Sequence, residues 1–124
     1  MVIVYLNEEK VISQILLDNK DKAGVYMWKH EESGKMYIGS AFYLSKRLAN
    51  YYSKAFISKT RGNSYIYNAL LSHGYSSFSV SILTYLDITE LDKKEANNLI
   101  ISQEQLYIDS MKPEFNINPI AGLD

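Results

Sequence analysis

Glu104 stands in the middle of a stripe of apolar residues on an expected helix. Isoleucines precede it by three and four residues, and Tyr107 and Ile108 follow it at the same spacing, so these side chains share one helical face. An ionised carboxylate on such a face is costly unless a cation or strong hydrogen-bond donors meet it. Glu104 is therefore a candidate for metal ligation or catalysis. The alternative is a structural ion pair, or a carboxylate that reaches water at the edge of the stripe.

Arg47 is a second charged residue in a setting of this kind. Its helical neighbours include Tyr43, Leu44 and Tyr51. A guanidinium is always charged and presents its donors in a flat fork, which suits the oxygens of a phosphate group. The alternative is an arginine that lies across tyrosine rings on the surface.

The segment GVYMWKHEESGKMYIG, residues 24–39, carries one tyrosine near each end. If EESG is the turn of a hairpin, Tyr26 pairs with Gly39 and Trp28 pairs with Tyr37, and all of them share one face of the sheet. Apolar side chains then fill the other face: Val25, Met27, Met36 and Ile38. Gly39 leaves open space opposite Tyr26, and the two tyrosines become diagonal neighbours. The alternative is a pair of ordinary sheet tyrosines.

The charges are unevenly distributed, although the formal net charge is only −1. No aspartate or glutamate occurs from Ser33 to Leu86. The same stretch contains eight tyrosines and the basic residues Lys35, Lys46, Arg47, Lys54, Lys59 and Arg61. A basic, aromatic and acid-free stretch is typical of a surface that meets a phosphate backbone. A solvated face with a chance gap in its acidic residues is the alternative.

The composition excludes several classes of protein. A hydrophobic fraction of 47% over 124 residues suits one folded domain. The chain has no cysteine, which excludes a disulfide scaffold, thiolate zinc sites and cysteine nucleophiles. No apolar run approaches the roughly 18–20 residues that span a bilayer, and the first residues do not form a secretory signal.

The elements that must position these residues can be placed by periodicity and by capping residues. Strands are expected at 24–29, 35–39 and 78–86, and residues 2–6 allow a further short strand. Helices are expected at 7–19, with Asn7 as the cap, and at 40–55. A third helix is expected at 65–73, with Asn63 or Ser64 as its cap and Gly74 as its end. A fourth is expected at 87–111, with a cap near Asp87 or Thr89 and an end imposed by Pro113. The predicted fold class is α/β (α+β), with a small three-stranded antiparallel sheet flanked by helices.

Together these residues resemble the GIY-YIG nuclease family. The first family tripeptide is similar to Gly24-Val25-Tyr26, with valine in place of isoleucine, and the second is Tyr37-Ile38-Gly39. The family arginine matches Arg47, ten residues beyond the second tyrosine, and the metal-binding glutamate matches Glu104. The late family asparagine matches Asn116, with Asn118 as the alternative.

The resemblance extends from about Lys20 to Gly122 and is greatest to fungal mitochondrial, intron-encoded homing endonucleases. It implies one GIY-YIG catalytic domain over residues 1–124, with residues 1–20 as an N-terminal extension and a mitochondrial location. Such relatives usually carry a separate DNA-recognition module after the nuclease domain, and we expect none within this sequence. Many also have a histidine in the loop after the arginine helix. Here that loop reads KTRGNS, which leaves His73 as a weak substitute.

The resemblance implies hydrolysis of DNA phosphodiester bonds with one Mg²⁺ or Mn²⁺ ion held by Glu104. Arg47 is expected to meet the charge that develops on the phosphate. Tyr26 is expected to position the attacking water and to take its proton, with its pKa lowered by Arg47 and the metal. Tyr37 is expected to orient the phosphate or Tyr26.

Further residues receive supporting roles. Gly39 keeps the floor of the pocket open, and Asn116 ties the tail to the core. The expected phosphate-binding residues are Lys35, Lys46, Tyr51, Lys54 and Arg61. With one carboxylate and a net charge near zero, the domain should bind DNA weakly, with little sequence preference and with steep salt dependence.

Three other functions compete with a homing endonuclease. One is a repair or structure-specific nuclease of the same family. Another is a nucleic-acid-binding or intron-maturation module that does not cleave. The last is a tyrosine-rich structural domain, against which the apolar setting of Glu104 argues. The retained set of Tyr26, Tyr37, Arg47 and Glu104 favours an active nuclease.

Overall fold

The computed structural model describes residues 2–6, 11–60 and 64–116 of the chain. The elements run in the order β1 (Ile3–Leu6), α1 (Val11–Asp18), β2 (Ala23–His30), β3 (Met36–Ala41), α2 (Leu44–Tyr51), α3 (Lys54–Thr60), α4 (Tyr65–His73), the 3₁₀ turn η1 (Tyr75–Ser77), β4 (Phe78–Leu86) and α5 (Lys93–Met111). The strands form one antiparallel sheet in the order β1-β4-β2-β3. None of the helices in the described part is both long and apolar enough to cross a membrane.

The sheet has four strands, so the prediction of three was wrong. The fourth strand is β1, which pairs with β4 from Ile3↔Ile82 to Leu6↔Ser79. Only Tyr5 of this strand is buried, and its hydroxyl donates a 2.9 Å hydrogen bond to Asp18 at the end of α1. A short strand with one buried side chain has only a weak alternating pattern in the sequence. Its place in the sheet depends on pairing with β4, which lies far away in the sequence.

The register of the β2–β3 hairpin is the predicted one. Tyr26 pairs with Gly39, and Trp28 pairs with Tyr37. Gly34 takes a positive φ of 76° in the turn, a conformation that glycine adopts without steric cost. The hairpin therefore places the tyrosines of both motifs on the same face of the sheet.

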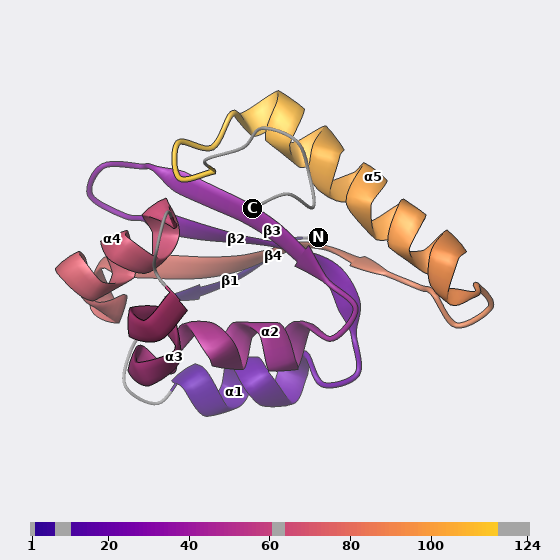
Figure 1. Ribbon diagram of the computed structural model, residues 1–124, viewed down its shortest axis with the longest axis horizontal. Helices are drawn as coiled ribbons and strands as arrows, with labels where there is room; N and C mark the ends of the chain where they lie inside the picture. Colours follow the sequence, from indigo (N-terminus) through magenta and orange to yellow (C-terminus); the bar gives the residue numbers. More distant parts are fainter. Residues whose placement is uncertain (1, 7–10, 61–63, 117–124) are drawn as a thin grey trace.

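The sheet lies between helices on its two faces, as Figure 1 shows, and each face has its own cluster of apolar side chains. Helix α5 covers one face, where Ile108 packs with Val25, Met27, Ile38 and Leu83. Helices α1 to α4 lie on the other face, and their apolar side chains surround Tyr26, Trp28 and Tyr37. Each face of the hairpin thus has its own helical cover, which confirms the predicted division of its side chains.

The expected helix over residues 40–55 is divided in the structure. β3 continues to Ala41, α2 begins at Leu44, and a break at Tyr52–Ser53 separates it from α3. The Ser53 hydroxyl accepts a 3.2 Å hydrogen bond from the Phe56 amide, so this serine starts a new helix instead of continuing the old one. Ser64 caps the start of α4 and Gly74 caps its end, as predicted. The proposed Asn7 cap and the alternative Asn63 lie outside the described residues.

Helix α5 begins later than the sequence suggested. Asp92 and Glu95 form a capping box at its start, with the Glu95 amide 2.8 Å from the Asp92 carboxylate. Asp87 instead accepts hydrogen bonds from the amide and hydroxyl of Thr89, in a local turn. The Asp87 side chain, which was expected to cap the helix, therefore stabilises a turn that precedes the helix.

The outer edge of β3 is paired by the segment that follows α5. The Asn116 side chain accepts a hydrogen bond from the Ile38 amide and donates one to the Ile38 carbonyl, both at 2.9 Å. The Phe115 amide donates to the Met36 carbonyl at the same distance. Asn116 therefore ties the tail to the edge strand, in the position that the sequence predicted for it.

Candidate active site

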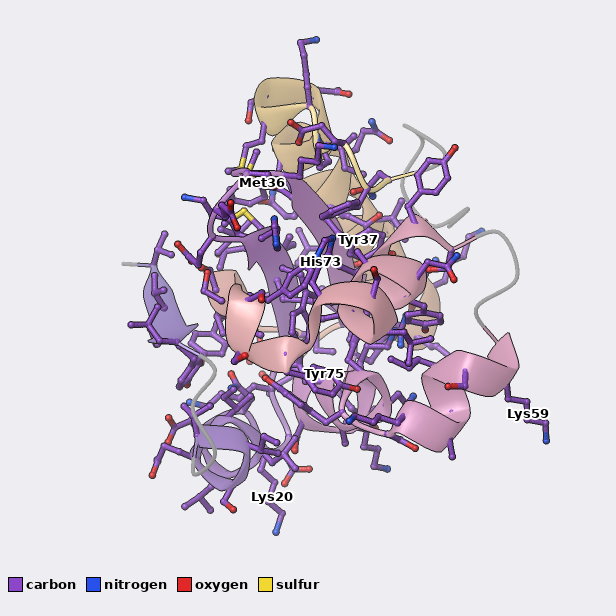
Figure 2. All side chains as sticks on the ribbon, turned by 90° about the vertical axis from the view of Figure 1, so that its left-hand side faces the viewer. Lys20, Met36, Tyr37, Lys59, His73 and Tyr75 are labelled. Carbon is purple, nitrogen blue, oxygen red and sulfur yellow. The ribbon has the colours of Figure 1, made fainter. Side chains whose placement is uncertain are left out.

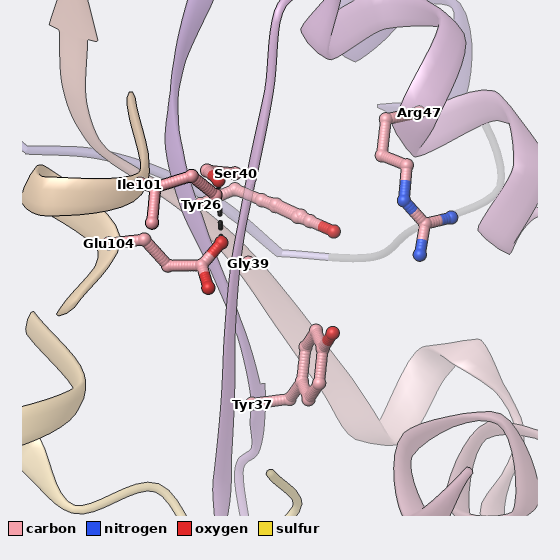
Figure 3. Close-up of a pocket in the computed structure, with 7 residues that line it drawn as sticks. All are labelled: Tyr26, Tyr37, Gly39, Ser40, Arg47, Ile101 and Glu104. Carbon is pink, nitrogen blue, oxygen red and sulfur yellow. Dashed lines mark hydrogen bonds between the residues drawn. The ribbon is translucent and has the colours of Figure 1, made fainter. Parts of the chain in front are cut away.

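One pocket is lined by all four of the predicted catalytic residues, which are Tyr26, Tyr37, Arg47 and Glu104. Its volume of about 120 Å³ corresponds to roughly four water molecules. The lining residues are Tyr26, Tyr37, Gly39, Ser40, Arg47, Ile101 and Glu104. They come from β2, β3, α2 and α5, so segments distant in sequence meet at one point (Figure 3).

The pocket wraps around β3, which is an edge strand of the sheet. Side chains alternate along a strand, so Tyr37 and Gly39 face the layer of α2 while Ser40 faces α5. In Figure 3 the Glu104 carboxylate lies on one side of the strand that carries Gly39, and the Arg47 guanidinium and the hydroxyl ends of Tyr26 and Tyr37 lie on the other. Such a site forms only at the edge of a sheet, where the two layers can reach each other.

Gly39 is required by the position of Tyr26. A Cβ atom on Gly39 would lie 2.4 Å from the hydroxyl oxygen and 2.6 Å from the Cζ atom of Tyr26. The sequence predicted open space at this point, and the phenol ring fills that space instead. Gly39 thus admits the ring of Tyr26, and it also lines the pocket.

Tyr26 is buried, and its hydroxyl is bonded to a second buried phenol. The hydroxyl oxygens of Tyr26 and Tyr51 are 2.8 Å apart, and both side chains are at most 1% exposed. Tyr51 in turn packs edge-on against Tyr26, with ring centroids 5.7 Å apart. Tyr51 therefore holds Tyr26 in place without lining the pocket, and its contact with phosphate stays a prediction.

The guanidinium of Arg47 is surrounded by phenols. Its central carbon lies 4.5 Å from the centroid of the Tyr51 ring, in a cation–π arrangement. Nη2 donates hydrogen bonds to the hydroxyls of Tyr51 at 3.3 Å and Tyr67 at 3.1 Å. Arg47 thus stacks on a tyrosine ring and also lines the pocket, and its contact with phosphate stays a prediction.

Glu104 is buried in the apolar stripe of α5, as its spacing predicted. It is 7% exposed, and the other buried residues of the helix are Ala96, Ile100 and Ile108. The Ser40 hydroxyl donates a 2.5 Å hydrogen bond to Oε1 of Glu104. This charge-assisted bond orients the carboxylate toward β3 and the pocket.

Burial raises the pKa of Tyr26 above its ordinary value. Loss of water is the largest contribution, and the positive charge of Arg47 and the hydrogen bond with Tyr51 offset only part of it. Arg47 therefore lowers this pKa as predicted, but desolvation outweighs its effect and the net pKa is raised. Tyr26 is a neutral phenol at neutral pH.

Arg47 keeps its positive charge in this environment. Burial by itself lowers its pKa, but the oxygens of Tyr26, Tyr51 and Tyr67 more than compensate and raise the pKa above its usual range. The pocket therefore holds a permanent cation on one side of β3 and a carboxyl group on the other.

The predicted phosphate-binding lysines lie outside the pocket. Lys35, Lys46 and Lys54 are exposed, and the Lys46 ammonium lies 4.9 Å from the centroid of the Tyr43 ring. Figure 2 shows Lys59 extending outward from α3. Arg61 lies outside the described residues.

His73 does not join the site. Its ring stacks on His30, with centroids 4.5 Å apart, at the turn end of β2. It is absent from the lining of the pocket.

Sequence reasoning missed Ser40 and Tyr67. Ser40 could have been found from strand alternation, because it follows Gly39 and must point toward the layer that contains Glu104. Tyr67 gives no such signal, since it is 20 residues beyond Arg47 and reaches it only through the packing of α4.

Two solved structures share this fold. One is the catalytic domain of the intron endonuclease I-TevI, in a mutant form, with a TM-score of 0.62 and 24% identity over 79% of this chain and 95% of that chain. The other is the catalytic domain of the homing endonuclease I-TevI, with a TM-score of 0.59 and 26% identity over 83% of this chain and all of that chain.

The fold, the pocket and a family match together define an endonuclease domain. Residues 22–118 match the GIY-YIG catalytic domain, and this range includes every residue that lines the pocket. The chain belongs to the GIY-YIG catalytic domain family.

The buried phenols predict a loss of stability at high pH. The pKa of Tyr26 and that of Tyr51 are raised in the folded state, mainly by desolvation. Their contribution is complete below the unfolded value of about 10 and is lost as the pH rises through the folded values. The free energy of unfolding should therefore be level up to about pH 10 and then fall by up to about 1.4 kcal/mol per pH unit for each phenol.

Urea denaturation across this pH range measures the effect. Tyr26→Phe should make the alkaline fall shallower, whereas Tyr65→Phe, at a residue that is 55% exposed, should leave its slope unchanged. Equal slopes in all proteins would contradict the assignment of the effect to the buried phenol.

Proposed function

We propose that this domain is a metal-dependent DNA endonuclease of the homing type. The observation that carries the proposal is the pocket at β3, where one carboxylate, one guanidinium and two phenols meet from four elements. These groups match the needs of phosphodiester hydrolysis: a site for a cation, a fixed positive charge, and hydroxyls that can orient water and phosphate.

The residues fit a magnesium-type ion better than a zinc ion. Among the described residues, no group of three or more histidine, cysteine, aspartate or glutamate side chains is placed to hold a metal. Zinc sites in proteins use three or four such ligands, whereas Mg²⁺ is commonly held by one or two carboxylates and keeps most of its waters. Glu104 would hold one Mg²⁺ or Mn²⁺ ion at the pocket. When bound, the ion would supply a water of lowered pKa and offset phosphate charge.

The protein's own groups have separate tasks in this proposal. Arg47 binds non-bridging oxygens of the scissile phosphate and meets the charge that develops there. Tyr26 enters the reaction as a neutral phenol, so it first orients the attacking water through a hydrogen bond. Tyr37, from the neighbouring strand, orients the phosphate. Ser40 holds the Glu104 carboxylate in place.

The homing type and a mitochondrial location rest on likeness. We propose both because the sequence resembles fungal mitochondrial, intron-encoded members of the family, and because the two structures described above are named as intron or homing endonucleases. We propose one catalytic domain over residues 1–124, in which residues 1–20 precede the matched range and contribute β1 and α1.

Cleavage should depend on both sides of the pocket. Incubation of the protein with supercoiled DNA and Mg²⁺ or Mn²⁺ should produce nicks, and chelation of the metal should abolish them. Glu104→Gln and Arg47→Ala should each lower the rate about 100-fold or more, the cost of removing one charged transition-state contact. A gel assay of nicked and linear DNA measures these rates.

The exposed Glu90→Gln, which also removes one carboxylate charge, serves as the matched control and should cleave at the parent rate. Nicking by Glu104→Gln at the parent rate would refute the proposed site. DNA binding without any cleavage by the parent would favour a binding or intron-maturation module.

DNA binding should be weak and steeply dependent on salt. Lys35, Lys46 and Lys54 are exposed within the acid-free stretch, and each phosphate contact contributes a slope of about −0.9 to log K against log salt. Lys46→Ala should reduce the magnitude of the slope by about one. Lys94→Ala, an exposed lysine on α5, should leave it unchanged. Gel shifts in increasing salt measure both slopes, and tight, salt-insensitive binding would contradict the proposal.

A further inference from the structure

The Arg47 side chain is held by more than its own helix. An arginine side chain has about 2 kcal/mol of rotamer entropy to lose when it is fixed in one orientation. Here the Tyr51 ring supports the flat face of the guanidinium, and Nη2 is bonded to two hydroxyls. The shorter of these bonds, at 3.1 Å, goes to Tyr67.

Tyr67 is itself fixed in the first turn of α4. Its amide donates a hydrogen bond to the Ser64 hydroxyl that caps the helix, at 3.3 Å. Its ring packs edge-on against Tyr51 and Phe56, with centroids 5.5 and 6.4 Å away, and the side chain is only 9% exposed. The hydroxyl of Tyr67 therefore has a defined position relative to the core.

Only one nitrogen of the guanidinium is used in these contacts, because both of the hydrogen bonds described above come from Nη2. The N–H groups of Nε and Nη1 are left as donors for the oxygens of a phosphate. Figure 3 shows the guanidinium extending toward the hydroxyl ends of Tyr26 and Tyr37 at the pocket.

We propose that Tyr67 is a positioning residue for Arg47. Its hydroxyl anchors Nη2, and the guanidinium is thereby held with its N–H groups at Nε and Nη1 available to the scissile phosphate. This inference rests on the proposed nuclease function, and it assigns a role to a residue that lies outside the GIY and YIG motifs and does not line the pocket.

Tyr67→Phe tests the proposal because it removes the hydroxyl and keeps the ring. The single-turnover cleavage rate should fall about tenfold, consistent with the loss of one hydrogen bond to a charged group. DNA affinity, which depends mainly on exposed lysines, should change less than about twofold. Tyr85→Phe is the matched control, because it removes a hydroxyl bonded to Asn19, away from the pocket, and it should cleave at the parent rate.

A double-mutant cycle separates positioning from a general structural effect. In the Arg47→Lys background, which keeps the charge but not the fork, Tyr67→Phe should cost less than about twofold, because the partner of the hydroxyl is gone. A full tenfold loss in both backgrounds would overturn the proposal. So would an unchanged rate for Tyr67→Phe in a parent that cleaves.

Nuclear magnetic resonance of the Arg47 guanidinium gives a readout that does not need cleavage. The Nη protons should give separate signals in the parent and averaged signals in Tyr67→Phe, because the hydroxyl no longer restrains rotation. Identical spectra would overturn the positioning role. Absence of nicking by the parent, with the spectral change still present, would refute the nuclease function and leave this role standing.

Discussion

The contact between Tyr26 and Gly39 is the constraint on which the rest of the site depends. A methyl group at position 39 would lie 2.4 Å from the Tyr26 hydroxyl, so the phenol can lie across β3 only if the residue opposite it has no side chain. The register of the hairpin sets these two residues against each other. From this position the hydroxyl of Tyr26 meets Tyr51, and Tyr51 supports Arg47. One cross-strand contact thus links the GIY and YIG motifs to the arginine helix.

The edge position of β3 explains how groups of opposite charge reach one pocket. Arg47 lies in the layer of α2, and Glu104 lies on α5 across the sheet. In the middle of a sheet, neighbouring strands would keep these layers apart. At the edge, Asn116 satisfies the free backbone groups of Ile38 and leaves the next part of the strand, at Gly39 and Ser40, as the wall of the pocket. The late asparagine therefore acts on the site by keeping its edge strand in place.

Local periodicity predicted much of this arrangement. The alternation of residues 24–39 gave the register and the two faces, and helical spacing gave the burial of Glu104. The features that the sequence did not predict depend on packing between segments that are distant in the sequence. The ring that fills the space at Gly39, the burial of Tyr51 and the bond from Arg47 to Tyr67 depend on how α2 and α4 sit on the sheet. The net rise in the pKa of Tyr26 was not predicted, because the sequence shows the neighbouring charge of Arg47 but not the loss of water.

Anomalous scattering from Mn²⁺ in crystals of the protein with a short DNA duplex is the most direct test of the pocket as the catalytic centre. We expect one anomalous peak, in contact with the Glu104 carboxylate, and a DNA phosphate between that ion and Arg47. A peak elsewhere with no metal at Glu104, or a phosphate bound away from Arg47, would contradict it.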